Sequence, residues 1–161
     1  MTLFVEPTLA LQAALGTRLA SSAAVTNLVP ADNIRADCAR PEVFPSILLG
    51  DGYVVDESKS FPRRHVRAFC DIHVWTQEAG MSGAKSIVGV IVSKLTNARL
   101  TFSDQTPFRC VDSQISQWRT MRDLDVRYAH GIVTYQALVE LPAWNDNGIG
   151  DWEDTMRWLE L

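Results

Sequence analysis

The chain has 161 residues, 47% hydrophobic and 21% charged, which is the balance of one globular domain able to bury a sizeable core. Its formal net charge is −4 and its basic residues form no stripe, which excludes the clustered Lys and Arg that duplex nucleic acid requires. No run of about 18 apolar residues predicts a membrane span, and the N-terminus lacks the features of a signal peptide, so we expect a cytosolic protein without a membrane partner.

The acidic excess lies at the C-terminal end. Residues 1–141 contain 14 Lys and Arg against 14 Asp and Glu, so the whole excess falls in residues 142–161, which also carry three tryptophans. We therefore expect two parts, an α+β domain over 1–141 and an acidic, tryptophan-rich extension over 142–161. Within the extension, an apolar stripe at helical spacing predicts a short helix with one face to be covered, by Trp152, Met156 and Leu159.

Three cysteines are too few and too widely spaced for a disulfide framework or a zinc knuckle. They are Cys38, Cys70 and Cys110, and no two of them form a C-x-x-C pair. We expect reduced thiols, mostly packed in the interior.

The first half of the chain predicts one long helix and several short strands. Leu11, Leu15 and Leu19 recur at helical spacing, so residues 7–21 should form an amphipathic helix lying on a sheet. The polar residues 51–66 are compatible with either a mobile loop or a splayed hairpin. Shorter elements are expected as a helical turn at 24–29, a small strand at 34–35 and a buried strand at 45–50.

The second half predicts a regular strand, a helix and a hairpin. Apolar and polar residues alternate over 67–76, the pattern of a strand with one face in the core. Apolar residues repeat at helical spacing over 83–96, and strands at 108–119 and 127–141 should form an antiparallel pair. The order of elements predicts an α+β fold, a mainly antiparallel sheet with two helices packed on one face.

Residues 80–84 (GMSGA) resemble the G-x-S-x-G elbow of serine hydrolases and lie between a strand and a helix. The residues before Gly80 separate this sequence from the strand, and Ala84 replaces the last glycine. Among the histidines, only His130 follows Ser82 as a possible base. A helix N-cap at Ser82 explains the same residue types, so a small hydrolase using Ser82 is the alternative function, and the favoured interpretation is a cap.

Other reactive side chains give no site. Cys70 and His73 fall on opposite faces of a strand, so they cannot converge on a metal, and Asp71 with His73 supplies two ligands without a third. His65 and His130 are isolated in the sequence. We interpret Asp123 and Asp125 as turn residues, and we expect no catalytic residue, cofactor or metal.

The string of features resembles the tail-completion (tail-terminator) family of long-tailed phages and phage-like gene transfer agents over about residues 8–140. The resemblance rests on hydrophobic patterns in a fixed order, not on catalytic signatures. In this sequence they are the PTLALQAAL helix at 7–15, FPSILLG at 44–50, IHVW at 72–75, the helix over 80–95, RDLD at 122–125 and HGIVTY at 130–135.

The resemblance implies a structural virion protein, located where the tail meets the head and assembled in the bacterial cytoplasm. Its subunits would form a homo-oligomeric ring, usually sixfold, that caps the tail tube, stops its growth and meets the head connector or stopper protein. DNA would pass through the lumen without specific binding, which neutral or acidic walls favour. The alternative within this class is another head–tail joining protein or a minor tail protein.

Exposed aromatic and arginine side chains dominate the contact energies of protein interfaces. The interface candidates chosen on this basis are Phe61, Arg63, Arg64, Trp75, Trp118, Trp144, Trp152 and Trp158. The extension itself has three open roles: packing on its own sheet, clasping the adjacent subunit, or engaging the tail tube or connector.

Overall fold

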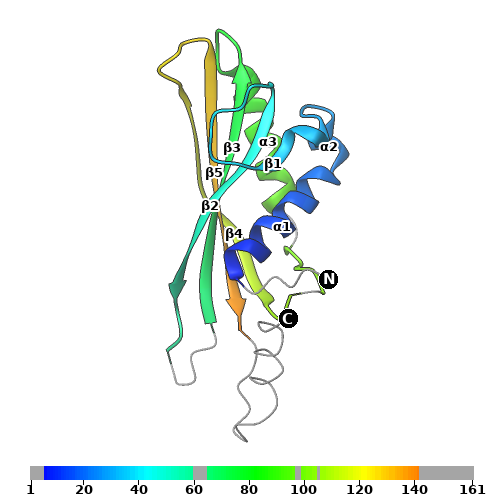
Figure 1. The fold of residues 1–161 in the computed structure, drawn as a ribbon, viewed down its shortest axis with the longest axis vertical. Coiled ribbons are helices and arrows are strands. Elements are labelled where there is room, and N and C mark those ends of the chain that lie inside the picture. Colours follow the sequence, from blue (N-terminus) through cyan, green and yellow to red (C-terminus); the bar gives the residue numbers. More distant parts are fainter. Residues whose placement is uncertain (1–5, 60–64, 97–98, 105, 142–161) are drawn as a thin grey trace, which may run out of the picture.

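The computed structural model describes residues 6–59, 65–96, 99–104 and 106–141, and it confirms the α+β class (Figure 1). Five strands form one sheet in the order β1-β2-β3-β5-β4; β1 runs parallel to β2, and the other neighbouring pairs are antiparallel. The helices α1 and α3 cover one face of this sheet. The elements are α1 (Pro7–Ala20), α2 (Ala23–Thr26), the 3₁₀ helix η1 (Ala31–Asn33), β1 (Ile34–Ala36), β2 (Ser46–Asp56), β3 (His65–Gln77), α3 (Ser82–Thr96), β4 (Arg109–Arg122) and β5 (Tyr128–Glu140).

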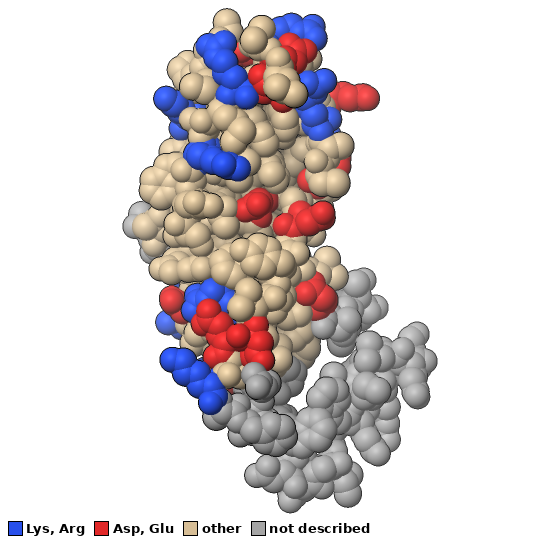
Figure 2. Space-filling model, turned by 90° about the vertical axis from the view of Figure 1, so that its left-hand side faces the viewer, with Lys and Arg blue, Asp and Glu red and all other residues tan. Residues whose placement is uncertain are grey.

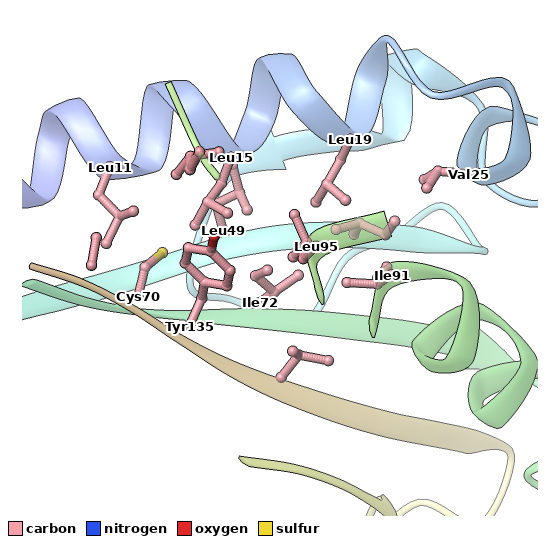
Figure 3. Close-up of a cluster of buried hydrophobic side chains, with 14 of the residues drawn as sticks. Leu11, Leu15, Leu19, Val25, Leu49, Cys70, Ile72, Ile91, Leu95 and Tyr135 are labelled. Atoms are coloured by element: carbon pink, nitrogen blue, oxygen red, sulfur yellow. The ribbon is translucent and has the colours of Figure 1, made fainter. Parts of the chain in front are cut away.

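The long N-terminal helix α1 forms as predicted because its start is capped and its leucines share one face. The Glu6 carboxylate accepts a hydrogen bond from the Leu9 N–H at 3.0 Å, and Pro7 occupies the first turn, where a missing N–H costs nothing. The side chains that point from α1 to the sheet are completely buried (Figure 3): Leu11, Leu15 and Leu19. Each contributes about 1.5–3 kcal/mol by leaving water.

The core lies between these helices and the central strands β3 and β5. All four core positions predicted on β3 are at most 2% exposed: Ala68, Cys70, Ile72 and Val74. On β5, Gly131 permits close packing of α3, because a Cβ there would lie 2.6 Å from Val88 Cγ2. The opposite face of the sheet is not covered by a helix, and it carries the residues that alternate with the core positions.

The polar segment after the buried part of β2 is a hairpin arm, not a loop, as far as the structure describes it. β2 is buried up to Gly50 and exposed from Asp51 to Asp56, where it remains paired with β3. A register shift between Leu49 and Gly52 separates the two parts. The interface candidates Phe61, Arg63 and Arg64 lie at 60–64, outside the described residues.

The start of α3 corrects the role predicted for Ser82. Ser82 is the first helical residue, and the capping acceptor is the carboxylate of Glu78, which accepts the N–H groups of Gly83 (3.0 Å) and Ala84 (2.9 Å). Burial raises the pKa of Glu78, but these hydrogen bonds and one from Thr76 Oγ1 outweigh burial and lower it overall. The cap was missed because the carboxylate reaches the helix across the bend at 79–81.

The β4–β5 connection is the predicted turn. The Asp125 carbonyl accepts the Tyr128 N–H at 3.0 Å, and its carboxylate accepts the Arg127 N–H at 3.1 Å. The pKa of Asp125 falls to about 2 because the Arg127 guanidinium and backbone N–H both donate to it. Among the described residues, no helix is long and apolar enough to cross a membrane. Residues 142–161, with the candidates Trp144, Trp152 and Trp158, lie outside the described part.

Candidate assembly surfaces

The face of the sheet opposite the helices, here called the outer face, is made by the outward-pointing residues of β2 to β5. Figure 2 views this side and shows a largely uncharged band between two more strongly charged ends. Cross-strand pairing places the members of the band on one face. They include Tyr53, Phe69, His73, Trp75, Gln114, Gln117, Tyr128, His130, Ile132, Thr134, Gln136 and Leu138.

Stacked rings give the outer face a fixed surface. Tyr53 stacks on Phe69 with ring centroids 4.5 Å apart, and Trp75 stacks on His130 at 4.0 Å. Phe44, which precedes β2, stacks on Tyr128 at 4.9 Å. Paired rings that are already held in place lose little conformational freedom when a protein partner covers them.

His130 is not isolated, contrary to the sequence interpretation. Its Nε2 lies 2.9 Å from Nδ1 of His73, although the two residues are on strands separated by α3 and β4 in the chain. Burial, and to a lesser extent the neighbouring His73, lower the pKa of His130 to about 4. Burial also lowers the pKa of His73, an effect that Asp71 partly opposes. Both rings are therefore neutral at pH 7, and one donates its proton to the other.

Most charges of the outer face lie toward its two ends, and an ion pair marks each end. At one end Arg67 binds Glu57 at 2.6 Å, and at the other Arg40 binds Asp123 at 2.8 Å. Between them, the Asp71 carboxylate accepts the Thr134 hydroxyl at 2.7 Å. Arg119, in register with Ile132, adds one cation to this band, and none of the ion pairs among the described residues involves it. A neighbouring protein that covers the band therefore has to pair this one guanidinium.

The two described tryptophans among the interface candidates lie on opposite faces of the sheet. Trp75 is half-buried on the outer face, where it pairs across the strands with His130. Trp118 is 56% exposed on edge strand β4 and pairs with core residue Val133, so it points to the helix side. The exposed helix-side margin of β4 around Trp118 is called the Trp118 edge below. The structure thus separates two residues that the sequence had grouped.

The residues considered for chemistry do not converge. His130 is on the outer face and Ser82 begins a helix on the other face, so Ser82 has no histidine base there. Cys70 lies in the core, where burial raises its thiol pKa to about 12, while His73 lies on the outer face. Within the described ranges, no group of three or more His, Cys, Asp or Glu is arranged to hold a metal ion. Cys110 is also buried, whereas Cys38 is exposed.

Known proteins similar to this chain come from phages and phage-like particles. A family model described as tail completion protein gp17 matches residues 13–140. A chain in the virion of a native gene transfer agent (GTA) particle is 24% identical, with a TM-score of 0.70, over 81% of this chain and 95% of that one. The gp17 protein of bacteriophage SPP1 is 21% identical, with a TM-score of 0.52, over 89% of this chain and 94% of that one. A search of the curated proteins found no match.

Proposed function

Because this chain belongs to the tail completion protein gp17 family, we propose that copies of it form a closed ring, sixfold, that ends the tail tube and joins the tail to the head connector. The family is one of structural phage tail proteins, and the chain is accordingly a component of the virion tail. The partners in this proposal are other copies of the chain, the tail tube protein and the connector or stopper protein. The chain acts by contact, without catalysis.

The positions of the two tryptophans support a ring. A closed ring is built from heterologous contacts, in which one surface of a subunit meets a different surface of the next. Trp75 and Trp118 mark two such surfaces on opposite faces of the sheet. In the proposed ring, the outer face around Trp75 meets the Trp118 edge of the neighbouring subunit. This placement of two aromatic surfaces is the observation that carries the proposal.

The charged ends of the subunit suit the other two partners. Once neighbours cover the uncharged band, the ion pairs Arg67–Glu57 and Arg40–Asp123 remain at its two ends. Partly exposed charges of this kind set orientation and specificity more than affinity. We assign the tail tube protein to one end and the connector to the other. Phe61, Arg63, Arg64 and the tryptophans of 142–161 stay candidates for these contacts.

The ring is tested by light scattering over a concentration series, with negative-stain images of the same samples. The wild-type chain should reach a mass of six times 17.9 kDa and appear as closed rings. Trp118→Arg removes one surface at an exposed position, and Trp75→Ala removes the other. Each variant alone should fail to form rings, whereas Lys85→Ala, on the exposed side of α3, should leave them intact.

Mixing the two variants distinguishes the kinds of contact. A Trp118→Arg subunit keeps its outer face and a Trp75→Ala subunit keeps its Trp118 edge, so an equimolar mixture should form dimers and no rings. Tyr53→Arg, at an outer-face residue that is 58% exposed, repeats the test should Trp75→Ala unfold the chain. Rings that persist in both single variants would refute these contact surfaces. A wild-type monomer at every concentration, with or without tail tubes, would refute the ring.

A further inference from the structure

A hollow of about 470 Å³ lies on the helix side of the molecule, between α1 and the segment 100–106. Leu100 and Phe102 in its wall are buried and belong to the core, and the Leu100 N–H donates to Ser113 Oγ on β4 at 3.1 Å. The α1 side of the hollow is formed mostly by small side chains: Ala10, Ala13, Ala14, Thr17, Arg18 and Ser21. Small side chains allow another segment to approach the helix closely.

Positive charge borders this hollow. Arg18 lines it and donates to the Lys94 carbonyl at 3.2 Å, so the backbone of Lys94 lies beside Arg18, and Arg99 directly precedes the lining residue Leu100. None of the ion pairs among the described residues involves these three cations. Asp104 is the acidic residue of the same segment, so these four side chains together keep a net positive charge, although residues 1–141 as a whole are neutral. An acidic segment is the complementary occupant.

The strand that leads into residues 142–161 ends near the hollow. Glu140, at the end of β5, is in register with Arg109 at the start of β4, and their side chains form an ion pair at 3.1 Å. Residue 142 therefore follows a point close to the segment 100–106. Residues 142–161 reach up to about 66 Å when extended or about 30 Å as a helix, which is enough to return along α1.

From these observations we propose that residues 142–161 of the same chain dock in the hollow. The apolar stripe of Trp152, Met156 and Leu159 packs against the small residues of α1, and the carboxylates of the segment lie near the three cations. The segment carries five Asp and Glu against one Arg, which matches the charge of the border. This inference is independent of the proposed ring, since it concerns contacts within one subunit.

Hydrogen exchange on the full-length chain tests the docking. At an effective concentration of about 1 mM, a tethered segment with a dissociation constant near 0.1 mM protects its site about tenfold. Trp152→Ala with Met156→Ala should therefore speed exchange about tenfold at residues 10–21 and 100–104. Trp158→Ala, which removes a tryptophan outside the stripe, is the matched control and should change exchange little. Lys94→Glu with Arg99→Glu, both exposed, should reproduce the effect of the stripe variant.

The outcomes separate docking in the hollow from other placements. Faster exchange confined to the two walls of the hollow, equal at low and high protein concentration, supports the proposal. Unchanged exchange in the stripe variant overturns it, and so does a change confined to the outer face, which would place the segment on the sheet. Protection that disappears on dilution also overturns it, because the occupant would then be the extension of a neighbouring subunit.

Discussion

Acidification should destabilise the protein through the histidine pair on the outer face. In the unfolded chain His130 titrates near its ordinary value of 6.5, whereas in the fold its pKa is about 4. Between these values the unfolded chain binds a proton that the folded chain does not bind. The stabilising contribution is therefore complete above about pH 7 and is lost as the pH falls toward 4.

The size of the effect follows from the shift and from the surroundings of the ring. A shift from 6.5 to about 4 corresponds to about 2 kcal/mol lost between pH 7 and pH 5. Asp123 opposes the shift and Arg119 adds to it. Because the ring is only partly buried, solvent screening reduces the expected loss to about 1 kcal/mol.

Urea unfolding at pH 7, 6 and 5 measures this loss. His130→Gln keeps a hydrogen-bonding side chain beside His73 but removes the titrating group, so its stability should fall by about 1 kcal/mol less than that of the wild type over this range. His65→Gln, outside the pair, should follow the wild type, and all chains share the same carboxylate titrations. Equal losses in His130→Gln and the wild type would refute the reasoning.

Three further changes test the packing. Glu78→Ala should lower the free energy of unfolding in urea by about 1–2 kcal/mol because α3 loses its cap, while Ser82→Ala should lower it by less than about 0.5 kcal/mol. A larger loss in Ser82→Ala than in Glu78→Ala would show that Ser82 is the cap. Gly50→Ala places a Cβ 2.8 Å from His73 Nε2 and should lower the free energy of unfolding by about 1–3 kcal/mol. Gly89→Ala, in open space on α3, should raise it by up to about 1 kcal/mol. Equal effects of the two substitutions would contradict the close approach of Gly50 to His73. Leu15→Ala should lower the free energy of unfolding by about 2–5 kcal/mol because it leaves a cavity in the core. A loss below about 1 kcal/mol would show that α1 does not pack on the core as the structure has it.

Periodic patterns in the sequence were sufficient to predict the helices and most of the strands. The leucines of α1 and the alternation along β3 each describe a single element, whose buried face is fixed by its own geometry. The fold class followed from the order of these elements. The length of the β2–β3 hairpin could not be predicted from the sequence. Residues 51–56 are polar and exposed, and only their pairing with β3 makes them a strand.

The candidate surfaces were predicted less completely. Trp75 and Trp118 were identified as exposed aromatic residues, but their placement on opposite faces depends on the register of β4 against β5. The alternation of apolar and polar residues along β3 and β5 identified the outward positions, including His73 and His130. This alternation was the one signal in the sequence for the contact between the two histidines. The hollow beside α1 had no signal at all, since it is formed by two segments distant in the chain.

The sequence by itself determined which residues of each element face the core and which protein family the order of elements resembles. Those properties depend on the spacing of apolar residues within each element and on the order of the elements, and both can be read directly from the sequence. Only the tertiary structure decided that His73 meets His130, that Glu78 caps α3 and that the two tryptophans define separate surfaces. These contacts join residues through strand register and helix placement, which the packing of the whole core sets.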